Sequence, residues 1–175
     1  MHQLDTVSIR EVSKMKVEQV MTRNVMVCTD ADTLNRAAQL MWDYDCGSIP
    51  VISANGQGEL VGVVTDRDLT MAAYTQGKPL YAIPVTTAMA HKVIACHVQD
   101  GISQAEALMR DNRVRRLPVL DNDRLVGMLS LSDLAREAQR EVAAGKRAEV
   151  TEESVSETLA ALCQPRTARE IAPTA

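Results

Sequence analysis

The chain has 175 residues, of which 46% are hydrophobic but only 2% are aromatic and none is Phe, so its core must be aliphatic. The net charge of −4 and the isoelectric point near 5.4 argue against binding to nucleic acid, which needs a basic face. No apolar run reaches the roughly 18 residues that a membrane-spanning helix needs, and the N-terminus lacks the apolar stretch of a secretory signal. We therefore expect a cytoplasmic protein without membrane insertion.

The first half of the chain is predicted to begin with a strand and a helix. Residues 25–28 are a short apolar run that is typical of a buried strand. Apolar side chains then recur over residues 34–41 at the spacing of one helix face. Asp30 and Asp32 precede this stretch, so we expect their carboxylates to cap the helix.

A β-hairpin and a second helix are predicted to follow. Two β-prone runs, 49–52 and 59–64, flank the turn sequence Asn-Gly-Gln-Gly at 55–58, which is typical of a hairpin. Because proline has no N–H to donate to a ladder, Pro50 is expected at the start of its strand. The helix is predicted over residues 66–76 and ends at a Gly-x-Pro sequence.

The second half of the chain predicts the same order of elements. A strand is expected over residues 93–96, and apolar positions over 102–109 mark the helix after it. A hairpin then joins strands at 117–120 and 125–129, and a closing helix runs over 131–144.

The two halves are copies of one unit. Residues of the first half that recur 68 positions later are Met21, Val25, Cys28, Asp32, Ala37, Leu40, Met41, Asp43, Pro50 and Val51. Beyond the hairpin, whose loop is shorter in the second copy, the residues that recur 65 positions later are Leu60, Val61, Gly62, Asp68 and Leu69. Chance does not keep register over such a span, so the chain contains a duplicated unit of about 60 residues.

This duplication sets the predicted organisation of the chain. The expected parts are an N-terminal extension (1–14), a first copy (15–83), a second copy (84–144) and a short helix with a disordered tail (145–175). The short helix is expected to begin at a capping box formed by Ser154 and Glu157 and to lie back on the two copies.

Each copy ends its third strand with the same motif: glycine, two apolar residues, a hydroxyl residue, two variable residues and aspartate. The hydroxyl and the carboxylate are Thr65 and Asp68 in the first copy, and Ser130 and Asp133 in the second. A strand-to-helix turn presents such groups to a cleft, where a carboxylate can accept hydrogen bonds from both hydroxyls of a ribose. The same spacing also fits a helix capping box, so both roles stay open.

The tandem unit, with Pro-Val in the second strand and this motif closing the third, resembles a cystathionine-β-synthase (CBS) domain pair of the stand-alone bacterial type over about residues 15–140. The resemblance implies an α+β fold in which two βαββα repeats pack as a pseudo-two-fold pair. It also implies binding of AMP, ADP, ATP or S-adenosylmethionine, regulation of an enzyme or transporter in trans, and homodimers. Trp42, at the edge of an apolar helix face, is expected either in the core or in such a dimer interface.

The resemblance also places the ligand. Ribose is expected on Asp68 and Asp133, with Thr65 and Ser130 as the partner hydroxyls. The adenine is expected against the first strand and the region of the second-strand proline, at Met21, Val27, Ile49 and Pro50 in the first copy and at Met89, Ala95, Leu117 and Pro118 in the second.

Basic residues before the second-strand proline distinguish the copies. Arg115 and Arg116 precede Pro118, whereas the first copy has no charged residue at this place. Arginine suits phosphate oxygens, so we expect a nucleotide with its ribose on Asp68 and its phosphates on the two arginines. The cleft at Asp133 lacks an equivalent pair and is expected to bind more weakly or to take a nucleoside. The alternative for the arginines is a solvated pair at a strand edge.

The cysteines and histidines give a weaker signal. The four cysteines show no zinc-ribbon spacing, and Cys28 and Cys96 are expected to be buried thiols. Cys96 and His97, with His91 nearby, are weak candidates for a metal site across a dimer, because tight sites usually need four spaced ligands.

These patterns favour a binding protein rather than an enzyme. No catalytic constellation, P-loop or dinucleotide-binding glycine run is present. The leading hypothesis is a regulatory module that binds an adenine nucleotide as an energy or stress sensor. The alternatives are a ligand-independent dimeric scaffold or stress protein, and a metal-binding CBS protein.

Overall fold

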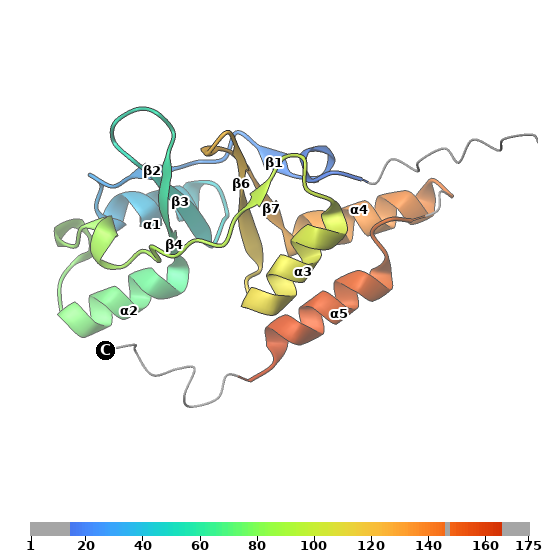
Figure 1. The fold of residues 1–175 in the computed structure, drawn as a ribbon. Coiled ribbons are helices and arrows are strands. Elements are labelled where there is room, and N and C mark those ends of the chain that lie inside the picture. Colours follow the sequence, from blue (N-terminus) through green and yellow to red (C-terminus); the bar gives the residue numbers. More distant parts are fainter. Residues whose placement is uncertain (1–14, 146–147, 166–175) are drawn as a thin grey trace, which may run out of the picture.

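The two copies lie side by side in the computed structural model, which describes residues 15–145 and 148–165 (Figure 1). The elements of the first copy are β2 (Cys28–Thr29), α1 (Leu34–Asp43), β3 (Ser48–Ile52), β4 (Leu60–Thr65) and α2 (Asp66–Gln76). Those of the second are β5 (Cys96–His97), α3 (Ile102–Asn112), β6 (Arg116–Asp121), β7 (Arg124–Ser130) and α4 (Leu131–Ala143). β1 (Thr22–Arg23) lies near the start of the first copy, and α5 (Glu152–Cys163) follows the second copy. The predicted α+β class and its repeated βαββα order are confirmed.

Each copy contributes a segment to the sheet of the other. β1, near the start of the first copy, pairs antiparallel with β7, so the sheet order in the second copy is β1-β7-β6-β5. In the first copy the order is β2-β3-β4, and Ala90 exchanges two backbone hydrogen bonds of 3.1 and 2.9 Å with Val63 of β4. The copies are therefore joined by backbone pairing and form one body.

Close backbone approach explains the glycine of the repeated motif. A Cβ built on Gly127 would lie 2.7 Å from the carbonyl oxygen of Thr22, which belongs to the incoming β1. A Cβ on Gly62 would first meet the side chain of Met89. Only glycine lets the exchanged segments come this near.

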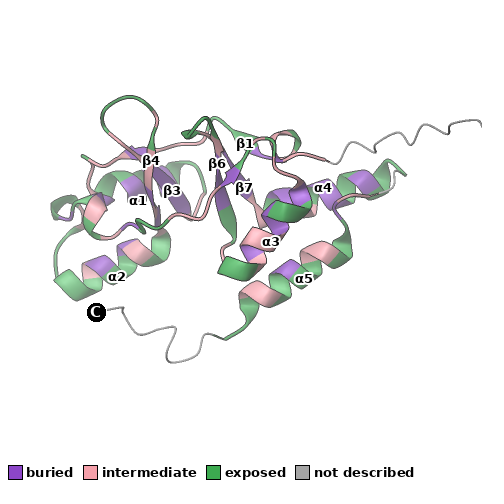
Figure 2. Cartoon of the chain, in the orientation of Figure 1, coloured by how far each residue is buried: buried purple, intermediate pink, exposed green. Residues whose placement is uncertain are grey.

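Each copy has its own core of aliphatic, methionine and cysteine side chains. Figure 2 colours the buried parts of the chain purple in both copies. The exchange carries over into these cores, because Met21 packs in the core of the second copy and Met89 in that of the first. Cys28 and Cys96 are each 1% exposed, which confirms that both thiols are buried.

The start of the first helix differs from the prediction. The carboxylate of Asp32 accepts hydrogen bonds from the N–H and hydroxyl of Thr29, at 2.7 and 2.9 Å, and Asp30 accepts from the N–H of Ala54. Neither caps α1. The N–H of Leu34 donates instead to the carbonyl of Ile83 at 2.9 Å, so the chain that leads to the second copy supplies a partner for one of the N–H groups at the helix start.

The strands are shifted from their predicted bounds. Pro50 is the third residue of β3 rather than its first. It is tolerated there because Val63, its partner on β4, directs its backbone bonds to Ala90 on the other side. The runs at 25–28 and 93–96 contribute only short strands, which begin at their cysteines.

The helices after the hairpins follow the prediction closely. α2 covers Asp66–Gln76 as expected, and Gly77 ends it with a φ of 60°. α4 ends at Ala143, one residue before the predicted end. Within the described residues, no helix is long and apolar enough to cross a membrane.

The C-terminal helix α5 packs on α3 and α4, as predicted (Figure 1). It begins earlier than expected, because Thr151 rather than Ser154 is the capping residue and accepts a 3.0 Å hydrogen bond from the N–H of Ser154. The hydroxyl of Ser154 donates to the carboxylate of Glu106, which is buried on α3. The predicted extension at 1–14 and most of the predicted tail lie outside the described residues.

Candidate functional site

Both repeated motifs form the capping box that the sequence allowed. In the first copy, one oxygen of Asp68 accepts from the N–H and hydroxyl of Thr65 at 2.8 and 2.6 Å. In the second copy, one oxygen of Asp133 accepts from the N–H and hydroxyl of Ser130 at 2.8 and 2.5 Å. Each cap engages the Oδ2 atom, so the Oδ1 atom of either carboxylate is left for another partner.

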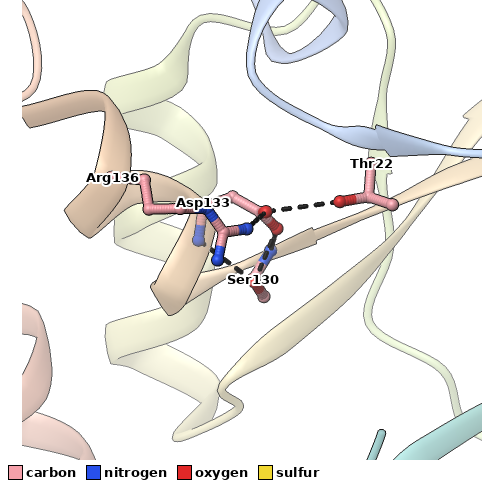
Figure 3. A network of polar contacts seen from close by, with 4 residues as sticks. All are labelled: Thr22, Ser130, Asp133 and Arg136. Atoms are coloured by element: carbon pink, nitrogen blue, oxygen red, sulfur yellow. Dashed lines mark hydrogen bonds and ion pairs between the residues drawn. The ribbon is translucent and has the colours of Figure 1, made fainter. Parts of the chain in front are cut away.

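The second oxygen distinguishes the two copies. Oδ1 of Asp133 accepts from the hydroxyl of Thr22 at 3.3 Å and forms an ion pair with Arg136 (Figure 3). No described residue donates to Oδ1 of Asp68. The side chain of Asp133 is 6% exposed, whereas that of Asp68 is half-buried.

A cavity of about 610 Å³ opens beside Asp133. Its predicted site residues come from both copies: Asp133, Ser130 and Arg116 from the second, and Ile49 and Pro50 from the first. Further walls come from the chain that enters the first copy, through Thr22, Val25 and Met26. Apolar and hydrogen-bonding groups therefore face one space between the copies.

A smaller cavity of about 190 Å³ opens beside Asp68. It is lined by Asp68 and Thr65 from the first copy, and by Arg116 and Pro118 from the second. Lys92 adds a second cation to its wall. The structure thus places the predicted carboxylate, hydroxyl and Arg116 together here as well.

Several predicted site residues line neither of these cavities: Arg115, Met21, Val27, Met89, Ala95 and Leu117. Arg115 is exposed, and its carbonyl accepts from the N–H of Leu131 at the start of α4. Leu117 is fully buried in the core. Neighbours of the predicted residues, such as Met26 and Ile94, line the cavities in their place.

The charge at Asp133 differs from the expectation. The sequence suggested that this cleft lacks a pair equivalent to Arg115 and Arg116, but Arg116 and Arg136 both line it, together with the acidic Asp45. Arg136 was missed although it lies three residues after Asp133 on α4, a spacing typical of an ion pair. Thr22 was missed because it comes from β1, whose pairing with the second copy leaves no local pattern.

The metal candidates do not meet in one place. Among the residues that the structure describes, no group of three His, Cys, Asp or Glu side chains could hold a metal ion. Burial, followed by the charge of Asp100, raises the pKa of the Cys96 thiol to about 12, so the thiolate that binds metals is disfavoured. This thiol donates to the carbonyl of Pro118 at 3.8 Å.

Trp42 is not a core residue, because 88% of its side chain is exposed. It lies at an apolar groove of about 390 Å³ between α1 and α2, with Met41 and Leu69. The second of its two predicted roles, a place in a dimer interface, stays a prediction.

Comparison with known proteins places the chain in a family. The sequence model of the CBS domain matches residues 17–74 and 85–140. The uncharacterized protein YlbB of Bacillus subtilis (strain 168) is 35% identical over 130 residues, which are 74% of this chain and 86% of YlbB.

Solved structures agree with this match. A putative acetoin utilization protein (AcuB) from Vibrio cholerae is 29% identical with a TM-score of 0.68, over 78% of this chain and 98% of that one. Hypoxic Response Protein I, described with two coordinated zinc ions, is 26% identical with a TM-score of 0.64, over 70% and 98%. The CBS domain pair of protein MJ0100, described in complex with 5'-methylthioadenosine and S-adenosyl-L-methionine, is 20% identical with a TM-score of 0.62, over 75% and 98%. At 20% identity the likeness shows the fold alone.

Proposed function

Because this chain belongs to the CBS domain family, we propose that it is a regulatory module that binds an adenine nucleotide of the AMP, ADP or ATP type and acts as an energy or stress sensor. The observation that carries the proposal is the cavity of about 610 Å³ beside Asp133, where a carboxylate, hydroxyls, arginines and apolar walls face one space. Small-molecule sites in proteins typically measure roughly 300–1,000 Å³. No catalytic step belongs to the proposal.

In the proposed complex, each part of the nucleotide meets a matching group. The adenine lies against the apolar wall formed by Ile49 and Met26. The ribose hydroxyls donate to Asp133, which already accepts from a hydroxyl, that of Thr22. The phosphates lie near Arg116, whose guanidinium forms no ion pair or hydrogen bond with any described residue.

The cleft at Asp133 is our first choice over the one at Asp68. A ligand there must displace Arg136 from the carboxylate, but the side chain of Arg136 is 69% exposed and can swing into solvent, while the ribose hydroxyls replace its hydrogen bond to the buried carboxylate. The cavity at Asp68, at about 190 Å³, would have to widen by moving packed groups. The predicted site on Asp68 and Thr65 therefore becomes the second and narrower cleft of the proposal, which is expected to bind more weakly.

Regulation follows from where the cavity lies. Ile49 belongs to the first copy and Asp133 to the second, so a nucleotide between them favours one relative orientation of the copies. A partner with different affinity for the two orientations then responds to the nucleotide. We propose a second copy of the chain, and an enzyme or transporter in trans, as such partners.

Isothermal titration tests the proposal with AMP, ADP, ATP and adenosine on the full chain. We expect binding heat with at least one of them, and weaker binding of GMP, because guanine carries one more exocyclic polar group that an apolar wall would leave without a hydrogen bond. No heat with any adenine compound would overturn the proposal and favour a ligand-independent dimeric scaffold. Equal affinity for AMP and GMP would remove the adenine assignment alone.

A further inference from the structure

Two residues are common to the walls of both cavities: Ser48 and Arg116. They are equivalents in the duplication, since Arg116 lies 68 positions after Ser48. Each pairs across its hairpin with the hydroxyl residue of the capping box, Ser48 with Thr65 and Arg116 with Ser130. One structural position therefore borders both clefts in each copy, and only the second copy carries a cation there.

The guanidinium of Arg116 extends into the first copy. A Cβ built on Gly47 would lie 3.8 Å from its Nη2 atom, and 3.1 Å from Oδ2 of Asp66. Arg116 is exposed, and no described residue forms an ion pair or hydrogen bond with its guanidinium, so the guanidinium donors are uncommitted. This arginine is within reach of both spaces.

Ser48 occupies the same border from the other side. Its side chain is 9% exposed, and its hydroxyl oxygen is buried without a hydrogen-bond partner among the described residues. Buried polar groups normally have a partner, so an unpaired hydroxyl between two cavities points to a ligand or water that reaches it.

The remaining charges belong to one cleft each. Arg136 and Asp45 line only the cavity at Asp133, and Lys92 lines only the cavity at Asp68. These groups affect the affinity of their own cleft. Arg116 is the charged residue that both cavities have in common.

We propose that the two clefts compete for Arg116, so that a phosphate-bearing ligand in one cleft lowers the affinity of the other. This inference rests on the proposed nucleotide binding and adds a rule for occupancy. A guanidinium engages a phosphate through a fixed fork of N–H donors, and that fork serves one phosphate well at a time. Adenosine, which has no phosphate, binds without this penalty.

Isothermal titration of the wild type with AMP and with adenosine measures the effect. Adenosine gives the baseline, because any difference between its two Kd values comes from cleft size. We expect the ratio of the weaker to the tighter Kd to be roughly 10-fold or more larger for AMP than for adenosine.

Two variants locate the cause. Ser48→Arg supplies the missing cation, so the affinity of the weaker cleft for AMP should rise. The ratio of the two Kd values for AMP should then fall to the ratio measured with adenosine. Arg116→Gln removes the shared cation, so the AMP ratio should fall to the same value as the tighter site weakens. Arg116 is exposed, and this second variant keeps the test decisive if Ser48→Arg does not fold.

Equal ratios for AMP and adenosine in the wild type would overturn the competition while leaving nucleotide binding intact. The competition would also be overturned if Arg116→Gln left the ratio of the two Kd values for AMP unchanged, or if adenosine bound in only one cleft. Absence of binding by both compounds would instead overturn the proposed function, and the competition with it.

Discussion

The two copies keep the same scaffold but differ in what surrounds it. Each has a capping box at the start of the helix after its hairpin, with the carboxylate Oδ2 atom bonded in the same way. Around it, the copies differ in cavity size, about 610 Å³ beside Asp133 against 190 Å³ beside Asp68, and in the partners of the Oδ1 atom. Groups that form the turn were retained after duplication, while groups that face the cavities diverged.

Matched changes at the two carboxylates give the largest expected effect. Asp133→Ala should weaken AMP binding by about 1.5–3 kcal/mol, the contribution of a charged hydrogen-bonding partner. Asp68→Ala removes the same cap from the other copy and should cost roughly 0.5–2 kcal/mol of unfolding free energy. Asp133→Ala should cost more than Asp68→Ala, because it also removes the acceptor of Thr22 and the partner of Arg136. Calorimetric titration and denaturant unfolding of both variants measure these two quantities. If the stronger binding of AMP is lost in Asp68→Ala but kept in Asp133→Ala, the cleft at Asp68 rather than the one at Asp133 is the high-affinity site.

The two motif glycines give a second comparison. Gly127→Ala should cost about 1–3 kcal/mol of unfolding free energy, because the new methyl group meets the backbone oxygen of Thr22. Gly62→Ala should cost less, because the nearest atoms belong to the flexible side chain of Met89. Thermal unfolding of the two variants tests this order, and equal losses would show that the exchanged segments are held with the same rigidity.

The helix faces of the copies differ as well, because α5 covers α3 and α4 while the groove between α1 and α2 holds the exposed Trp42. If that groove is the dimer interface, Trp42→Ala should weaken self-association by on the order of 1 kcal/mol or more, as buried aromatic anchors do. Sedimentation velocity over a range of concentrations measures this. Leu159→Ala, on the exposed part of α5, is the control, and an equal shift in both variants would argue against the groove.

The smallest expected effect concerns Glu106, which lies under α5. Burial raises the pKa of this carboxyl, while the hydrogen bond from Ser154 and the charge of Arg110 partly oppose the shift. A folded pKa above the unfolded one means that stability is greatest below the unfolded pKa and falls as the pH rises through the folded pKa. Glu106→Gln should therefore raise the Tm at pH 8 but not at pH 4. The corresponding gain in unfolding free energy should be less than about 1 kcal/mol. The control Glu59→Gln changes a carboxylate at an exposed site and should leave the Tm unchanged at both pH values.

The parts of the fold that depend on local pattern were predictable from the sequence. The bounds of α2, the turn at 55–58 and both capping boxes follow from residues close together in the chain. β1 does not, because two residues carry no periodicity and its partner lies about a hundred positions away. The same long-range pairing delivers Thr22 to Asp133, so the site was only partly predictable. Cavity size depends on side-chain packing throughout, which residue spacing does not encode.

The exchange of β1 and of the segment at Ala90 has a consequence for how such a protein can arise. A single unit made as a separate chain would carry a strand that belongs to a neighbour, and its own sheet would present an unpaired edge. Two such chains would complete each other by swapping these arms. Each unit is therefore built to be completed by a second unit rather than to stand as a self-sufficient domain.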